Sequence, residues 1–324
     1  MNGRNSAAQK LRAALFSACL IGVAAPAPAQ TFPDRPIKII APFTPGSPND
    51  VVARLIAPAM SSKLGQSVVI DNRGGAAGTL GVGLAVKAPN DGYTVVIGDL
   101  GSLIIAPLAN PAVGYTYRDL TPIGLMATVS IVVSANPNSP DNSIGDFIAR
   151  AKAQPGKLTY GTSGIGAPSH LAMEYLRSRT GVEILHVPYK GGAQAVAGLL
   201  GGQVDIVVDG AAMAQVKAGK LKALAVTGPR LPALPDVPGI GETIPDFSFT
   251  NWWGLLAPVG TSADVVKRLN AELNTIAVMP DVRDKLRDLG LAAQGDSPLQ
   301  FADRLRTEAE RVARIVKDAG IKLE

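Results

Sequence analysis

Three glycine-rich stretches carry residue types that can bind an anion without reacting with it. They are residues 42–50, 72–78 and 161–170. Each follows a predicted strand and leads into a predicted helix. The free N–H groups and the dipole of a helix N-terminus attract negative charge, and glycine lets a ligand approach the backbone. Ser47, Thr162 and Ser163 add hydroxyl donors. Glycine is common at strand-to-helix junctions, so each loop alone is also typical of a plain turn.

Other residues in or near these loops are candidates for contact with a bound solute. Phe43, in the first loop, could cover a carbon skeleton, although core packing explains it equally well. Ala76 lies in the second loop, where the backbone is expected to approach a ligand. Asp209 follows an apolar strand and could accept a hydrogen bond from a ligand hydroxyl or amine. A solvated strand end is the alternative for Asp209.

The residues of a catalytic or metal site do not appear in a recognisable pattern. The nucleophile-elbow pattern G-x-S-x-G is absent, as are the Walker A and dinucleotide-binding fingerprints. His170 and His186 are not at metal-ligand spacing. Ser163 and His170 could be drawn as nucleophile and base, but no orienting acid is evident. We therefore expect no catalytic residue, metal or cofactor, and a hydrolase or isomerase in the same cleft remains an alternative.

The elements that must position these loops are short strands alternating with helices. Strands are predicted at residues 37–40, 67–70, 93–97, 158–160, 184–187, 204–208 and 221–227. Helices are predicted at 49–64, 264–278 and 298–318, from apolar spacing and capping residues such as Ser47 with Pro48. This alternation predicts an α/β fold with mostly parallel sheets.

Two long extended stretches, residues 123–136 and 247–258, are expected to be crossovers between two lobes. The chain would enter the second lobe once and return once. Lobe 1 would then contain residues 30–128 plus 250–324, and lobe 2 residues 129–249.

The first 29 residues are typical of a secretory signal peptide. Arg4, Lys10 and Arg12 precede an apolar run and a small-residue site that ends at Ala29. The run is too short to cross a bilayer, which needs about 20 apolar residues. A lipid anchor at Cys19 is the alternative. We therefore expect a periplasmic protein from which residues 1–29 have been removed.

Charge and cysteine content exclude other classes of protein. The net charge of the whole chain is +5, and three basic residues of the signal segment leave about +2 without it. Lysine and arginine are scattered, whereas a nucleic-acid footprint needs a clustered basic face. Cys19 is the only cysteine, so the exported chain could form neither a disulfide nor a thiolate metal site.

Several sequence stretches, taken in order, are specific in combination. They include DNRGGA at 71–76, DGYT at 91–94, AKAQPGK at 151–157, HVPYKG at 186–191, ALAVT at 223–227 and WGLLAP at 253–258. With these stretches the chain resembles the substrate-binding receptors of tripartite tricarboxylate transporters, also called Bug receptors. The resemblance runs from about residue 32 to residue 323.

The resemblance implies a two-lobed type II periplasmic binding protein fold with hinge crossovers. It implies that one carboxylate of a small organic anion is held by the first loop and another by the third loop. Carried over by position, the first set is Phe43, Gly46, Ser47 and Asp50, and the second set is Thr162, Ser163, Gly166, Ala167 and His170.

We also expect a monomer that delivers its ligand to membrane transporter subunits, and a receptor that signals to a membrane partner is the alternative. Ser47, Gly74 and Ala167 depart from the family's usual glycine, proline and Ser/Thr. These departures leave the expected fold unchanged and put the identity of the ligand in doubt.

Overall fold

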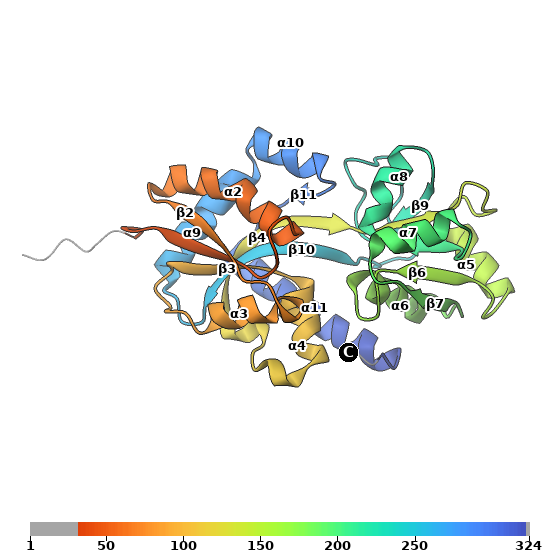
Figure 1. The fold of residues 1–324 in the computed structure, drawn as a ribbon, viewed down its shortest axis with the longest axis horizontal. Helices are drawn as coiled ribbons and strands as arrows, with labels where there is room; N and C mark the ends of the chain where they lie inside the picture. The colour runs from red at the N-terminus through yellow and green to blue at the C-terminus, as the bar shows by residue number, and fades with distance from the viewer. Residues whose placement is uncertain (1–31, 322–324) are drawn as a thin grey trace, which may run out of the picture. The chain divides into compact units, whose positions relative to one another are not determined.

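The computed structural model describes residues 32–321, so the predicted signal segment lies outside the described residues. Residues from Arg35 onward form one compact unit (Figure 1). Within it the strands form two sheets, one of six strands and one of five. In the described part of the chain, no helix combines the length and apolar character that crossing a membrane requires.

The six-stranded sheet has the order β11-β4-β10-β3-β1-β2. Its strands are β1 (Ile37–Ala41), β2 (Val68–Asn72), β3 (Thr94–Asp99), β4 (Leu120–Ser130), β10 (Thr250–Pro258) and β11 (Ala292–Ala293). Its helices are α2 (Pro48–Leu64), α3 (Thr79–Val86), α9 (Ala263–Ala277), α10 (Pro280–Asp288) and α11 (Pro298–Asp318). Strand β1 lies parallel to both β2 and β3, so the loops after these strands meet at one edge.

The five-stranded sheet has the order β7-β6-β8-β5-β9. Its strands are β5 (Val132–Ala135), β6 (Thr159–Thr162), β7 (Leu185–Pro188), β8 (Ile206–Val208) and β9 (Lys222–Val226). Its helices are α5 (Ile144–Ala153), α6 (Pro168–Thr180), α7 (Gly192–Leu200) and α8 (Met213–Lys217). Short turns of helix complete the fold: η2 (Ala76–Gly78), η3 (Gly101–Ile105), α4 (Ala106–Ala109), η4 (Pro111–Val113), η5 (Tyr117–Asp119), η6 (Gly210–Ala212) and η7 (Ile240–Glu242).

The predicted α/β architecture is confirmed, but the prediction of mostly parallel sheets is wrong. Strand β10 runs antiparallel to β3 and β4, and β5 runs antiparallel to β8 and β9. The reason lies in the path of the chain. It passes from one sheet to the other through β4 and β5 and returns through β10, so these strands run in opposite directions (Figure 1).

Thr227 joins the two connections between the sheets. Its hydroxyl accepts a hydrogen bond from the amide of Ile131 at 2.9 Å and donates one to the carbonyl of Phe249 at 2.6 Å. Its own amide donates to the Ile131 carbonyl, and its carbonyl accepts from the Phe249 amide. Ile131 lies on the outgoing path and Phe249 on the return. One buried side chain therefore fixes the spacing of both crossings.

Helix α2 shows how the local sequence builds an element that carries a loop. Ser47 is the N-cap and accepts from the amide of Asp50, and Pro48 occupies the first helical position. Val52, Ile56 and Met60 follow one another at a spacing of four residues and are fully buried. Burial stabilises the fold by roughly 1.5–3 kcal/mol for each of these side chains. The left-handed conformation of Gly65, with φ of 69°, ends the helix. Packing of α2 thus fixes the position of the first loop.

Candidate functional site

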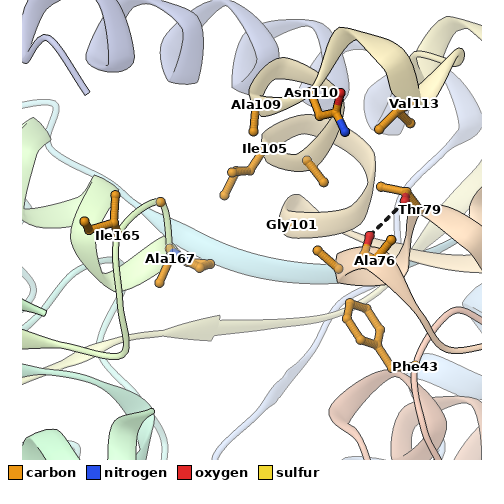
Figure 2. Close-up of a pocket in the computed structure, with 14 residues that line it drawn as sticks. Phe43, Ala76, Thr79, Gly101, Ile105, Ala109, Asn110, Val113, Ile165 and Ala167 are labelled. Carbon is orange, nitrogen blue, oxygen red and sulfur yellow. Dashed lines mark hydrogen bonds between the residues drawn. The ribbon is translucent and has the colours of Figure 1, made fainter. Parts of the chain in front are cut away.

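A cavity of about 590 Å³ opens beside loops that follow strands of both sheets. Its lining residues are Phe43, Ala76, Ala77, Thr79, Gly101, Ile105, Ala106, Ala109, Asn110, Val113, Ile165, Gly166, Ala167 and Pro168. Figure 2 shows Ile165 and Ala167 on one loop, facing side chains from the other sheet. Ligands of open α/β sheets bind beyond the carboxyl ends of the strands, so this is the expected position of a binding site.

The ring of Phe43 lies against the second loop because Gly78 has no side chain. A Cβ atom at Gly78 would lie 2.9 Å from Cζ of Phe43 and 2.9 Å from Cβ of Ser102. Gly78 also has a φ of 89°, in the left-handed region that favours glycine. The amide of the Asn72 side chain donates to the Phe43 carbonyl at 3.2 Å. These contacts leave Phe43 half-buried in the cavity wall.

The buried carboxylate of Asp50 holds the first loop in place through hydrogen bonds. It is 2% exposed and accepts hydrogen bonds from the Gly46 amide at 2.9 Å, from Arg54 at 2.9 Å and from Asn72 at 2.9 Å. Burial acts to raise the pKa of Asp50, but these hydrogen bonds outweigh it and hold the pKa below its usual value. The Ser47 hydroxyl caps α2 through the Asp50 amide. Gly46, Ser47 and Asp50 therefore bond to one another and to their own sheet.

The second loop holds two alanines in a left-handed conformation. Ala76 has a φ of 47° and Ala77 a φ of 54°, and both line the cavity. This conformation costs roughly 1–2 kcal/mol for each residue that has a Cβ. Such strain persists where surrounding packing imposes it, and it is concentrated at ligand sites. The strained pair therefore supports a binding role for this wall.

A fourth loop, which follows β3, was missed by the sequence analysis. Asp99 is 6% exposed and accepts from the Ser102 amide at 2.7 Å, at the start of the π-helical turn η3. Burial raises the pKa of Asp99 even though Ser102 and Asn49 bond to it. The Tyr115 hydroxyl donates to the Ser102 carbonyl at 2.7 Å. The run Gly98 to Ser102, directly after a strand, was the available sequence signal.

The third loop rests on a stack of three rings. Thr162 is fully buried, and its hydroxyl lies 2.7 Å from Nε2 of His186. His186 stacks on His170 with ring centroids 4.0 Å apart and on Tyr160 at 4.8 Å. The Thr162 hydroxyl is also 3.3 Å from the Gly164 amide. Thr162 and His186 thus set the shape of the loop.

A buried carboxylate lies on the far side of this stack. Glu174 is 4% exposed, accepts from Arg177 at 2.7 and 2.8 Å, and lies 3.8 Å from Nε2 of His170. Burial lowers the pKa of His170. Burial and the neighbouring His170 lower the pKa of His186 to about 4. Both rings are therefore neutral at neutral pH.

Ser163 and His170, the pair considered as nucleophile and base, each bond to another partner. The Ser163 hydroxyl lies 3.1 Å from the Ser169 hydroxyl. Nδ1 of His170 accepts from the Gly166 amide at 3.1 Å, so its proton is on Nε2. His170 fixes the path of the loop into α6.

Helix α6 starts at this loop without a side-chain cap. Ala167 occupies the N-cap position with φ of −61° and ψ of 153°, and its methyl group accepts no hydrogen bond. The amides of Ser169 and His170 lie in the first turn, where no helical carbonyl can accept from them. Ala167 and Pro168 line the cavity, so this helix start opens into it.

Asp209 lies elsewhere. Its carboxylate accepts from the Ala211 amide at 2.9 Å, and a Cβ at Gly192 would lie 2.1 Å from it. Asp209 therefore packs against the start of α7. The neighbouring Gly210 lines a second cavity of about 300 Å³, to which Gly46 also contributes.

The predicted site residues thus fall into two groups, those that line a cavity and those that do not. Phe43, Ala76, Gly166 and Ala167 line the larger cavity. The residues that line neither cavity instead form hydrogen bonds within their own loop or to a neighbouring element; they are Ser47, Asp50, Thr162, Ser163, His170 and Asp209. Their contact with a ligand stays a prediction. The aliphatic wall of Ile105, Ala109, Val113 and Ile165 was not predicted, because isolated apolar residues give no sequence signal for a cavity.

Comparison with known proteins gives a consistent result. The pattern of the family described as "Tripartite tricarboxylate transporter family receptor" matches residues 52–321. Protein BugT of Bordetella pertussis is 35% identical over 314 residues, which are 94% of this chain and 95% of that protein. These matches confirm the resemblance found in the sequence stretches.

Solved structures agree on the fold. The R. palustris protein Rpa4515, solved with adipate, is 36% identical with a TM-score of 0.73, and the alignment covers 90% of this chain and 99% of that one. MatC from Rhodopseudomonas palustris, solved with bound malate, is 32% identical with a TM-score of 0.68, covering 88% and 100%. The predicted two-lobed binding-protein fold is therefore confirmed.

Proposed function

This chain belongs to the family of tripartite tricarboxylate transporter receptors, and on that premise we propose that it captures a small carboxylated organic anion in the periplasm. It would deliver the anion to the membrane subunits of a transporter of that type. It would act as a monomer, without chemistry on the ligand, after removal of residues 1–29.

The observation that carries this proposal is the cavity lined by strand-end loops of both sheets. A ligand that touches both walls would favour a closed arrangement, because only differential affinity shifts such an equilibrium. The relatives solved with adipate and malate support a carboxylate as the ligand. We assign direct ligand contact to Phe43, Ala76, Gly166 and Ala167, which line the cavity.

The other predicted site residues would act by holding the loops in shape. Gly46, Ser47 and Asp50 would fix the first loop, and Thr162, Ser163 and His170 the third. Asp209 would contribute only if closure brought the start of α7 toward the ligand. The lobes would comprise residues 30–128 plus 250–324 and residues 129–249, moving about the segments near Thr227.

The test is a thermal-shift screen of purified residues 30–324, unfolded and refolded first to remove any ligand that copurifies. The library contains carboxylates, amino acids and neutral analogues. A ligand at 100 times its Kd should stabilise the fold by about 2.7 kcal/mol. Stabilisation by neutral analogues alone would contradict a carboxylate receptor, and conversion of the acid during incubation would favour an enzyme.

A further inference from the structure

Resting on the proposed function, we propose that this cavity selects a monocarboxylate with an apolar body, and discriminates against dicarboxylates and hydroxy acids of similar length. The carboxylate would lie at the start of α6, and the apolar body would lie between Ile165 and the wall formed by η3, α4 and η4.

The wall on the six-stranded-sheet side is aliphatic and fixed in place. Ile105, Ala109 and Val113 line the cavity. Ile105 is 7% exposed and belongs to the hydrophobic core, and Val113 packs against that core. The core behind these side chains holds them in position, so the apolar surface exists before a ligand arrives.

An apolar side chain faces this wall from the third loop. Ile165 is 52% exposed and lines the cavity on the loop before α6, across from Ile105 and Ala109 (Figure 2). A hydrocarbon body between the two sides would remove both surfaces from water. Contact with water leaves this surface available for binding.

The polar side chains in the lining are few, and all of them are neutral. The Thr79 hydroxyl donates to the Ala76 carbonyl at 2.8 Å, and the Asn110 side-chain oxygen accepts from the Ala112 amide at 3.0 Å, which leaves the Asn110 NH2 group as a neutral donor. None of the described lining residues carries a charge. A ligand hydroxyl or a second carboxylate would therefore lose water without gaining a charged partner.

A buried acid behind the wall on the six-stranded-sheet side acts in the same direction. Oδ1 of Asp99 lies 3.1 Å from the position that a Cβ of the lining residue Gly101 would occupy. Arg54, on helix α2, already bonds to Asp50 and Asn72. A second carboxylate placed on this side would meet a buried acid and no free cation among the described residues that line the cavity.

The start of α6 offers the carboxylate more than a helix dipole. It lacks a side-chain cap, so the Ser169 and His170 amides remain as donors. The Ser163 and Ser169 hydroxyls share a single 3.1 Å hydrogen bond, so one of their two hydrogens has no acceptor among the described residues. Either hydroxyl can be the donor of the pair, so the remaining hydrogen is on the buried Ser169 or on the half-buried Ser163, in both cases beside the start of α6.

The experiment is calorimetric titration of refolded residues 30–324 with two matched series. One contains butanoate, hexanoate and octanoate, and the other contains succinate, adipate and suberate, with malate added. We expect the affinity to rise about fourfold per methylene in the first series. Hexanoate should bind at least tenfold more tightly than adipate or malate.

Ile165→Ser tests the apolar contact directly and does not threaten folding, because Ile165 is exposed. It should weaken hexanoate binding about tenfold and butanoate binding less. Leu299→Ser is the matched control, since Leu299 is 83% exposed and lies outside the cavity lining, and it should change neither.

The outcomes separate this inference from the proposed function. If adipate or malate binds more tightly than hexanoate, with no gain from added methylenes, the protein is a carboxylate receptor and the apolar selection is wrong. If hexanoate affinity is unchanged in Ile165→Ser, the site assigned to the apolar body is wrong. If no acid in either series binds but another carboxylate stabilises the protein in the thermal-shift screen, the apolar selection is wrong and the proposed function stands; if no carboxylate does so in either assay, the proposed function itself fails.

Discussion

Replacing Thr227 by valine removes one hydroxyl from the point where both connections between the sheets meet. Valine keeps the shape of threonine but can neither accept from the Ile131 amide nor donate to the Phe249 carbonyl. Thr227 is 1% exposed, Ile131 6% and Phe249 0%, so water cannot replace the lost partners. Leaving a buried polar group unpaired costs roughly 1–3 kcal/mol, and two are affected. We expect the free energy of unfolding to fall by about 2–6 kcal/mol.

The assay is urea unfolding together with calorimetric melting of the refolded protein. For a chain of this size the melting temperature should fall by roughly 4–12 °C. Thr227→Ser keeps the oxygen and loses a methyl group, so it should cost only about 1 kcal/mol. Thr275→Val is a second control, because Thr275 is exposed and its hydroxyl bonds only within α9. That change should stay within about 0.5 kcal/mol.

Comparing the stabilities of Thr227→Val and Thr227→Ser tests whether the hydroxyl stabilises the connections between the sheets. Equal stability of the two variants would show that the hydroxyl does not hold the crossings, and the hydrogen-bond reasoning would be refuted. A large loss for Thr227→Val with an unchanged Thr275→Val would locate the effect at the hinge. Ligand affinity should also change, because the hinge sets how the two walls of the cavity meet.

Three further predictions concern the loops. Ala167→Ser should stabilise the ligand-free protein by about 1 kcal/mol, because serine would cap α6, and it should weaken carboxylate binding for the same reason. Chemical unfolding measures the first effect and titration the second, and tighter binding would contradict an uncapped helix start. Gly78→Ala should weaken ligand binding and lower the free energy of unfolding by at least about 1 kcal/mol, because the new Cβ would lie 2.9 Å from Phe43 and from Ser102. An unchanged melting temperature and affinity would exclude this steric effect. The pKa of His186 is lowered to about 4, so the folded protein favours the neutral ring. Between pH 6.5 and 4 the unfolded chain therefore binds more protons than the folded protein, and the free energy of unfolding should fall as the pH drops through that window. His186→Gln should flatten this profile in melting scans, and an unchanged slope would assign the effect to other groups.

Elements governed by local chemistry were predicted well from the sequence. The helix predicted at residues 49–64 is α2 (Pro48–Leu64), and the one at 298–318 is α11 (Pro298–Asp318). Capping residues and apolar spacing act within a few residues, so the sequence reveals them directly. Strand direction in β5 and β10 was not predictable in this way, because it depends on how the chain passes between the sheets.

The candidate site is harder to predict from the sequence because its side chains have more than one available partner. Ser47 and Thr162 were predicted as donors for a ligand; in the structure the Ser47 hydroxyl accepts from the Asp50 amide and the Thr162 hydroxyl bonds to His186, and their contact with a ligand stays a prediction. A sequence shows that a hydroxyl is present but not which group lies nearest after folding. The wall of η3 and α4 was missed for a related reason. Its apolar residues look like ordinary core, and only the fold shows that Ile105 and Ala109 border a cavity.

The polar side chains of these loops form hydrogen bonds inside the protein, and this affects how a ligand is recognised. Loops held by the hydrogen bonds of Asp50 and by the His170–His186 stack are ordered before a ligand binds, so little conformational entropy is lost in ordering them. The cavity then offers a ligand mainly backbone amides and apolar side chains. Backbone amides recognise a carboxylate without regard to the rest of the molecule. Discrimination between acids must therefore come from the shape and polarity of the wall, which places it in residues such as Ile105 and Ile165, outside the glycine-rich loops that first drew attention in the sequence.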